Sequence, residues 1–323
     1  MLDPQSNIST NVRSTGAAPL PLRLAFTALG AIAPSLAARA GERLFLRPRR
    51  HAVRARPRPQ DGEAFVVPCG RERLVAWRTG EGPAVLLVHG WSGRASQLTP
   101  FVEPVVAAGC TAITFDAPAH GASTGRLTSG IGFAEAVSAV ARHVGARAAI
   151  AHSLGGAGLA WAIAGGLRLD AAVLIAPPRG PVEFFDRFCE ALELRPEVRD
   201  ATRARLERRL GLVLEEFDLS RRVGPGTPLL VFHDRDDREV PWRDGHDIAR
   251  AWPGAELVST TGLGHRRILR DAAVTRRAVS FVEDRLARCA CGRRISGPDG
   301  TRECSQCALE RELWDKSSRW VRS

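Results

Sequence analysis

From residue 64 onward the chain alternates between short apolar runs and stretches of helical periodicity, and this alternation restricts the fold more than any other feature. The runs at 84–90 and 111–116 are dominated by apolar residues, as strands buried on both faces require. Alternation of this kind implies right-handed crossovers between parallel strands. We therefore predict an α/β fold with a mostly parallel, doubly wound sheet, whose ligands gather at the carboxyl ends of the strands.

The expected elements follow from these runs and the segments between them. Two strands of a meander are expected at 63–70 and 71–80. The other expected strands lie at 84–90, 111–116, 148–153, 171–177, 228–234 and 255–260. Helices are expected at 95–108, 129–144, 154–166, 243–252 and 268–288.

An insertion at 179–226 separates two of the expected strands and carries helical patterns of its own. It fits a helical cap over the site. Four of its apolar residues have the spacing that buries one helix face; they are Phe184, Phe185, Phe188 and Leu192. These side chains either line a pocket for an apolar substrate or simply pack the cap.

The segment AAIAHSLGG at 148–156 ends an expected strand in Ser153, set between small residues. A nucleophile elbow has this form, because a buried strand turns sharply into a helix and lifts the serine hydroxyl clear of the sheet. Ala151 stands where the usual Gly-x-Ser-x-Gly pattern has its first glycine, and Gly155 keeps the second. The alternative is an ordinary serine N-cap on a helix that begins at Leu154.

Two backbone amides near Ser153 are candidates for stabilising an oxyanion. In HGWSG, Gly90 permits a turn that points the N–H of Trp91 into the site. The N–H of Leu154 follows the candidate nucleophile at a helix N-terminus, where the helix dipole favours negative charge. The alternative for HGWSG is a plain glycine-rich loop.

A serine nucleophile needs a base, and the base needs an acid that orients it. His265 lies in GLGHRRIL, and Asp237 lies in HDRDDREVP, three residues before Val240. Asp236 and Asp234 are the alternatives for the acid. We expect His265 to take the Ser153 proton, and activity to fall as His265 becomes protonated below neutral pH.

Five motifs follow one another at compatible spacing: HGWSG, DAPAHG at 116–121, AHSLGG, HDRDDREVP and GLGH. Over residues 62–288 the chain resembles the serine hydrolases of the α/β-hydrolase fold, the esterase and lipase group. The resemblance implies an oxyanion amide at Trp91 and a triad of Ser153, Asp237 and His265. The departure at Ala151 leaves the triad intact.

Other polar residues near these motifs are interpreted as structural. His152 should point away from the site, because alternate strand residues face opposite sides. Asp116 is expected to hold backbone amides. His233 lies too far along the chain from the family's histidine position to be the base.

The N-terminal part divides into a disordered tail at 1–20 and an apolar helix with a basic linker at 21–61. The charge-free run at 24–38 is too short to span a bilayer, and Pro34 interrupts it. Six arginines follow at 47–58. Residues 21–58 either contact anionic lipid at a membrane surface or dock on the domain, followed by a solvated linker. A cleaved secretory leader is the less favoured interpretation.

The C-terminal segment 289–323 contains four cysteines in a CxC and a CxxC pair separated by twelve residues; they are Cys289, Cys291, Cys304 and Cys307. Four thiolates suit one tetrahedral zinc in a closed, structural site. Paired disulfides and free thiols are the alternatives. No cofactor for catalysis is expected.

The net charge of +11 arises almost wholly from arginine, since Lys316 is the only lysine. Such a bias is weak evidence of a nucleic-acid partner, and none is expected. The layout of the cysteines indicates a reduced compartment, so we expect a cytoplasmic protein, with peripheral contact at the inner face of the membrane as a further expectation. The predicted function is hydrolysis of a small-molecule acyl ester or thioester. The alternative is a non-catalytic scaffold of the same fold that binds protein or nucleic acid through its basic surface and cysteine-rich tail.

Overall fold

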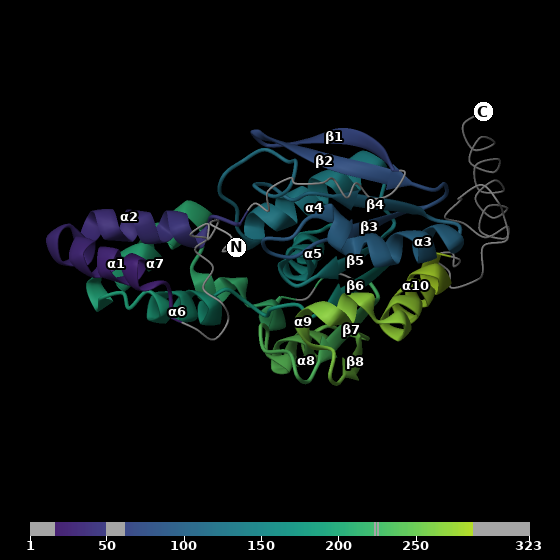
Figure 1. The fold of residues 1–323 in the computed structure, drawn as a ribbon. Coiled ribbons are helices and arrows are strands. Elements are labelled where there is room, and N and C mark those ends of the chain that lie inside the picture. The colour runs from purple at the N-terminus through teal and green to yellow at the C-terminus, as the bar shows by residue number, and fades with distance from the viewer. Residues whose placement is uncertain (1–16, 50–61, 223, 225, 287–323) are drawn as a thin grey trace, which may run out of the picture.

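The computed structural model describes residues 17–49, 62–222, 224 and 226–286 (Figure 1). Its sheet contains β1 (Glu63–Cys69), β2 (Glu72–Thr79), β3 (Ala84–Val88), β4 (Thr111–Phe115), β5 (Ala148–His152), β6 (Ala171–Ile175), β7 (Leu229–Asp234) and β8 (Glu256–Thr260). The strand order is β1-β2-β4-β3-β5-β6-β7-β8. The pairs β1–β2 and β2–β4 are antiparallel, and the other pairs are parallel. The predicted α/β fold with a mostly parallel sheet is confirmed, and each observed strand falls inside a predicted one.

Helices cover both faces of the sheet, as the doubly wound arrangement requires. One face carries α4 (Gly130–Val144), α5 (Leu154–Ala164) and α8 (Trp242–Ala251). The other carries α3 (Thr99–Ala107) and α10 (Ala272–Leu286). Short helices join these elements: η1 (Ala95–Leu98), α9 (Gly264–Arg267) and η4 (Ile268–Arg270). The long helix predicted at 268–288 is thus divided, because the Asp271 carboxylate accepts hydrogen bonds from the amides that begin α10.

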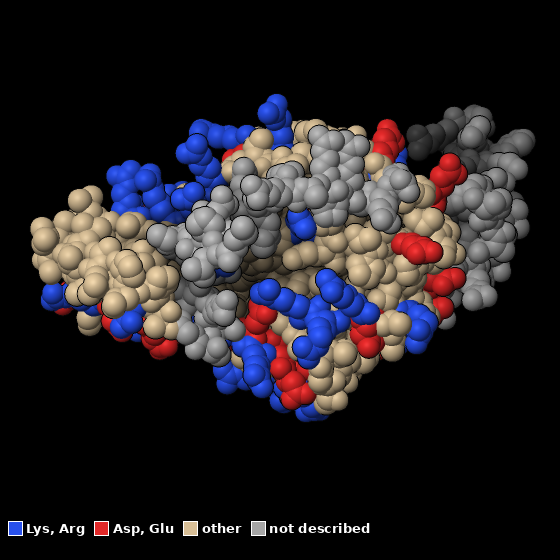
Figure 2. Space-filling view, viewed as in Figure 1, with Lys and Arg blue, Asp and Glu red and all other residues tan. Residues whose placement is uncertain are grey.

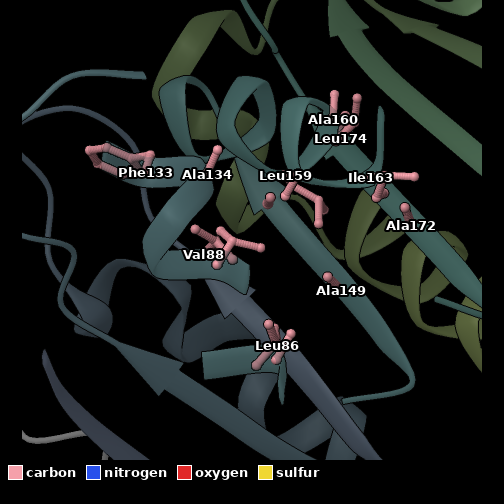
Figure 3. Close-up of a cluster of buried hydrophobic side chains, with 14 of the residues drawn as sticks. Leu86, Val88, Phe133, Ala134, Ala149, Leu159, Ala160, Ile163, Ala172 and Leu174 are labelled. Carbon is pink, nitrogen blue, oxygen red and sulfur yellow. The ribbon is translucent and has the colours of Figure 1, made fainter. Parts of the chain in front are cut away.

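Alternate residues of the central strands enter two separate cores. On β3, Leu86 and Val88 face the α4–α5 side, whereas Val85 and Leu87 face the α3–α10 side. Figure 3 shows part of the α4–α5 core, with Phe133 and Leu159 on the helices and Leu86, Ala149 and Leu174 on the strands. Small residues on these strands let the helices approach the sheet closely.

The insertion between β6 and β7 forms a helical cap, with α6 (Val182–Ala191), α7 (Pro196–Leu210), η2 (Leu214–Phe217) and η3 (Leu219–Arg221). Two N-terminal helices, α1 (Leu20–Ile32) and α2 (Pro34–Phe45), lie against α6 and α7 at one end of the molecule (Figure 1). Pro34 begins α2, since a proline tolerates the first helical position, where its missing N–H costs nothing. We refer to α1 and α2 together as the N-terminal hairpin.

The N-terminal hairpin and the cap share one apolar core. Phe45 of α2 contacts the rings of Phe185 and Phe188 of α6 edge to face. Glu42 is buried and forms ion pairs with Arg205 at 2.7 Å and Arg209 at 2.5 Å. The helix predicted at 24–38 is therefore two helices that dock on the cap.

Several predictions concern segments outside the described residues. The four-cysteine cluster, Cys289, Cys291, Cys304 and Cys307, lies there, as does most of the basic linker. Within the described ranges no group of three or more histidine, cysteine or acidic side chains is placed to hold a metal ion. None of the helices described has the length and apolar character needed to cross a membrane.

Candidate active site

Ser153 occupies the sharp turn between β5 and α5, with φ of 52° and ψ of −125°. This left-handed conformation costs about 1–3 kcal/mol for a residue with a side chain. The Ser153 amide donates to the Ile175 carbonyl oxygen at 2.9 Å, which helps to hold the turn. Ser153 stands at the N-cap position of α5, yet its hydroxyl makes no capping hydrogen bond. The N-cap interpretation therefore accounts for its position but not for its side chain.

Two glycines allow the backbone loops around Ser153 to approach closely. A Cβ on Gly155 would lie 2.3 Å from the His89 carbonyl oxygen, and a Cβ on Gly90 would lie 2.9 Å from the Ser153 Cβ. Neither position has room for a side chain. Ala151, in contrast, is fully buried in the α4–α5 core, which accommodates its methyl group.

The side chains of Ser153, His265 and Asp237 form a continuous chain of hydrogen bonds. His265 Nε2 lies 2.9 Å from Ser153 Oγ, and His265 Nδ1 lies 2.7 Å from Asp237 Oδ2. An ionised carboxylate only accepts hydrogen bonds, so His265 carries its proton on Nδ1 and Nε2 accepts from the serine hydroxyl. All three residues are buried, with at most 9% of their surface exposed. The serine hydroxyl thus faces a base that is already oriented to accept its proton.

Asp237 is stabilised as a carboxylate by several donors. Its Oδ1 accepts from the amides of Glu239 at 2.8 Å and Val240 at 2.9 Å. Nε2 of His233 lies 3.6 Å from its Oδ2. Burial alone would raise the pKa of Asp237, but the nearby His233 ring and the hydrogen bonds from His265 and the Val240 amide hold that pKa well below its usual range. The group opposite His265 is therefore charged throughout the neutral range.

The other two carboxylates considered for the acid bind backbone amides and a threonine hydroxyl instead. Asp234 Oδ2 accepts from Thr260 Oγ1 at 2.7 Å and from the Leu263 amide at 3.0 Å. Asp236 Oδ2 accepts from the Gly262 amide at 2.8 Å. Both carboxylates therefore fix the loop that carries His265, and the structure brings Asp237 to the His265 ring.

Two buried histidines brace the strand ends beside Ser153. His152 Nε2 donates to the His265 carbonyl oxygen at 2.9 Å. His89 Nδ1 donates to the Gly90 carbonyl oxygen at 2.7 Å, and its Nε2 accepts from the Ala117 amide at 2.9 Å. Burial lowers the pKa of His152 to about 3 and that of His89 to about 4. Both rings are neutral at physiological pH and act as fixed hydrogen-bonding struts.

The loop after β3 is held by the DAPAHG segment. The Ser92 amide donates to His120 Nε2 at 2.9 Å. Asp116 accepts from the amides of Ala95 at 2.7 Å and Ala122 at 2.8 Å. The Asp116 carboxylate thus binds backbone amides of two loops. It takes no part in the hydrogen bonds that join Ser153, His265 and Asp237.

The amides of Trp91 and Leu154 belong to residues that line the same cavity as Ser153. Within the described residues neither amide has a hydrogen-bond acceptor. That of Leu154 lies in the first turn of α5, where unpaired N–H groups carry partial positive charge. The cavity beside the candidate nucleophile is therefore lined by two residues whose backbone amides are not already paired.

A cavity of about 1900 Å³ extends from Ser153 and His265 to the cap and the N-terminal hairpin. Phe184 of α6 lines it, and Phe188 both lines it and belongs to the core that the hairpin and the cap share, whereas Phe185 and Leu192 belong to that core alone. The four predicted apolar residues are thus divided between pocket and packing. Seven arginines and three glutamates line the described wall, so its charge is positive.

The sequence did not indicate the roles of two residues near the site. His233 contacts Asp237, and a fully buried histidine at a strand end does signal a polar partner. Which residue that partner is depends on the turn after β7, which the sequence does not specify. Arg94 lines the cavity half-buried, and in the part of the chain that the structure describes it has no ion-pair partner.

Comparisons with known proteins show the family to which the chain belongs. The model of the "Alpha/beta hydrolase family" matches residues 85–278, more than half of the chain. The esterase Pf2001 of Pyrococcus furiosus has a similar fold, with a TM-score of 0.58 and 16% identity over 73% of this chain and 98% of that one. Est1E of Butyrivibrio proteoclasticus, solved with ferulic acid, gives a TM-score of 0.54 and 18% identity over 70% of this chain and 100% of that one. A search of curated proteins finds no match. The protein belongs to the alpha/beta hydrolase family.

Proposed function

We propose that the protein is a serine hydrolase that cleaves a carboxylic ester or thioester through Ser153, His265 and Asp237. The observation that carries the proposal is the pair of hydrogen bonds from Ser153 Oγ to His265 Nε2 and from His265 Nδ1 to Asp237 Oδ2, at 2.9 and 2.7 Å. Nucleophile, base and orienting acid are in register without further movement. Esterases among the structures of similar fold support the choice of an ester.

The mechanism follows from these contacts. Ser153 Oγ attacks the acyl carbon while its proton passes to His265 Nε2, and Asp237 stabilises the imidazolium that forms. The amides of Trp91 and Leu154 donate to the tetrahedral oxyanion. Collapse breaks the bond to the leaving group, which takes the proton from His265. Water then attacks the acyl enzyme by the same route, releasing the acid and restoring the serine.

The lining of the cavity suits an acyl chain beside a polar or anionic portion. Phe184, Phe188 and Leu214 offer apolar surface from the cap, and Leu22 and Phe45 offer it from the N-terminal hairpin. The positive wall favours a leaving group or product that carries negative charge. The carboxylate product itself meets this condition.

A fluorophosphonate probe tests the nucleophile directly. We expect stoichiometric labelling of the wild type and none of Ser153→Ala, with His265→Ala labelled at least 100-fold more slowly. Ser96→Ala is the matched control, since Ser96 lines the same cavity and lies outside the triad. Equal labelling of Ser153→Ala and the wild type would refute the assignment.

Turnover of p-nitrophenyl esters of increasing chain length tests the substrate class. We expect kcat/KM to rise with chain length until the apolar part of the cavity is filled. A protein that is neither labelled nor active on any ester would support the alternative, a scaffold of this fold that binds partners through its surface.

A further inference from the structure

The outward face of the N-terminal hairpin is a continuous apolar surface. Leu20 and Leu24 are each 59% exposed, Leu36 is 56% exposed, and Ile32 is 85% exposed. Leu20, Leu24 and Ile32 share one side of α1, because residues four or eight positions apart lie on the same helix face. Figure 2 shows a largely uncharged area at this end of the molecule, with charged side chains along its edges.

Charge is missing from this face over two helical segments. Between 17 and 36 the exposed residues are Ala17, Pro19, Leu20, Pro21, Leu24, Ala25, Thr27, Ala28, Ala31, Ile32, Pro34, Ser35 and Leu36. Arg23 is the one charged residue of this stretch, and it pairs with Glu193 of the cap. Large exposed apolar patches on soluble proteins mark sites of interaction.

The opposite face of the N-terminal hairpin is fixed to the cap, so the apolar face has a defined orientation. Gly30 of α1 and Gly41 of α2 approach α7 so closely that a Cβ would lie 3.2 Å from Val198 and 3.0 Å from Thr202. Packing on α7 keeps the exposed leucines from folding inward. One face of the hairpin is therefore packed against the cap, and the other face is exposed.

Positive charge borders the exposed face along α2. The described N-terminal segment, 17–49, contains five arginines, and its one acidic residue, Glu42, is buried between Arg205 and Arg209. Arg39 and Arg43 are exposed on α2 just after the apolar face, and within the described ranges they have no ion-pair partner. An apolar helix face bordered by unpaired cations is complementary to an anionic lipid surface.

We propose that the outward face of the N-terminal hairpin docks on an anionic lipid bilayer. The exposed side chains are aliphatic and contribute two hydroxyl groups, Thr27 and Ser35, as hydrogen-bonding side chains. Specific protein interfaces instead rely on aromatic and arginine anchors with a hydrogen-bonded rim. A bilayer requires only apolar surface and positive charge. The alkyl groups enter the acyl region while Arg39 and Arg43 meet the lipid phosphates.

Docking in this orientation also concerns the cavity that contains Ser153, and this step rests on the proposed function. The inner side of the same hairpin contributes Leu22, Leu44 and Phe45 to the cavity that contains Ser153. The hairpin that meets the bilayer in this proposal thus also supplies apolar wall to the cavity that contains Ser153. Binding of the protein to vesicles does not depend on hydrolysis, so the two proposals fail separately.

Vesicle co-sedimentation of the full chain tests the docking. We expect the protein to pellet with vesicles of phosphatidylcholine and phosphatidylglycerol, and at least tenfold less with phosphatidylcholine alone. Leu24→Glu combined with Ile32→Glu should lower the partition coefficient at least tenfold. Arg39→Gln combined with Arg43→Gln should lower it severalfold and reduce its dependence on salt.

Val66→Glu is the matched control, because Val66 is an equally exposed apolar residue (53%) on β1, far from the hairpin. It should leave binding unchanged. Thermal unfolding shows whether each variant is folded, and exposed sites make large losses of stability unexpected. The proposal is overturned if the wild type does not pellet, or if Leu24→Glu with Ile32→Glu binds like the control. It is equally overturned if that double variant only dissolves a dimer seen by sedimentation velocity without vesicles.

Discussion

His152 and His265 are joined by a hydrogen bond of 2.9 Å between the ring Nε2 of the first and the carbonyl oxygen of the second. His152 is the last residue of β5, directly before Ser153. The residue next to the candidate nucleophile therefore holds the backbone of the candidate base. Burial lowers the pKa of His152 to about 3, with the nearby His265 adding to the effect, so this strut remains neutral and can hold its bond at any physiological pH.

Replacing His152 should misplace His265 without removing it. We expect His152→Leu to lower kcat by about 10-fold to 100-fold, the loss typical of a small displacement of a catalytic group. His152→Gln keeps a donor near the Nε2 position and should recover part of that loss. Ester turnover by the two variants, with fluorophosphonate labelling as a second measure, checks the prediction. Equal activities for the leucine and glutamine variants would show that the hydrogen bond is unimportant.

Asp237→Asn should lower kcat by about 10⁴-fold, because an amide does not hold His265 in the tautomer whose Nε2 accepts the serine proton. Asp236→Asn is the control, since that carboxylate binds the Gly262 amide and lies outside the triad chain. We expect at most a severalfold loss there. A steady-state comparison at saturating ester decides between the two carboxylates. A larger loss for Asp236→Asn would reverse the assignment of the acid.

Stability should fall as the pH drops from 6.5 toward 4. His89 and His152 have folded pKa values of about 4 and about 3, below the usual 6.5, so the unfolded chain binds more protons in this window. The free energy of unfolding should decrease by about 2 kcal/mol for each histidine between neutral pH and pH 5. The stabilisation from the lowered pKa of Asp237 is present above the usual aspartate pKa and is lost progressively only as the pH falls below about 4.

Urea unfolding at several pH values measures this dependence. His89→Asn should be less stable at neutral pH, because it leaves the Ala117 amide or the Gly90 carbonyl without its partner. Its stability should nevertheless vary less with pH than that of the wild type. An unchanged slope in this variant would mean that His89 titrates normally in the folded state.

The sequence predicted the sheet well because each strand is a short apolar run bounded by turn residues. It also predicted Ser153, Asp237 and His265 as the candidate triad, and the structure joins these side chains by hydrogen bonds. Their loops lie at strand ends, where chain order and local chemistry were enough to suggest them. The contacts of His152 and His233 could not be predicted in this way. His152 meets a carbonyl 113 positions away, and the position of His233 depends on how the turn after β7 closes.

The N-terminal hairpin shows the same limit on a larger scale. The apolar run at 24–38 indicated a helix, but periodicity identifies a face without naming what it packs against. The docking of α2 on α7 depends on Glu42 meeting Arg205 and Arg209, more than 160 positions away. Local patterns therefore predicted elements, whereas the pairing of the hairpin with the cap required the folded chain.

Gly155→Ala should be strongly destabilising, because the new methyl would lie 2.3 Å from the His89 carbonyl oxygen. Backbone must shift to relieve that contact, at a cost of about 1–3 kcal/mol or more, and the Ser153 turn would shift with it. Gly156→Ala is the neighbouring control, since its nearest contacts are at 3.4 Å and alanine favours the helix. Thermal unfolding and ester turnover of both variants test this difference. Comparable behaviour of the two would show that the turn tolerates a side chain at 155.

Glu42→Gln should loosen the N-terminal hairpin while leaving the hydrolase core folded. Burial tends to raise the pKa of Glu42, but the hydrogen bonds from Arg209 and Arg205 hold it below the usual value, so the carboxylate is charged at neutral pH. Losing that charge weakens two ion pairs on a buried group, which should cost about 2 kcal/mol given that both arginines are partly exposed. Amide hydrogen exchange should rise in α1 and α2 and stay unchanged in β3 and β5.

Glu197→Gln is the matched control, because Glu197 is exposed and pairs with Arg195 at 3.6 Å on the cap surface. Exposed pairs contribute little to stability, so exchange in the hairpin should match that of the wild type. Since the pKa of Glu42 is lowered, the wild-type hairpin should keep its protection at neutral pH and lose it as the pH falls below the usual carboxyl range. Protection that is independent of pH in the wild type and unaffected by Glu42→Gln would place the hairpin's attachment in its apolar contacts with α6 and α7 alone.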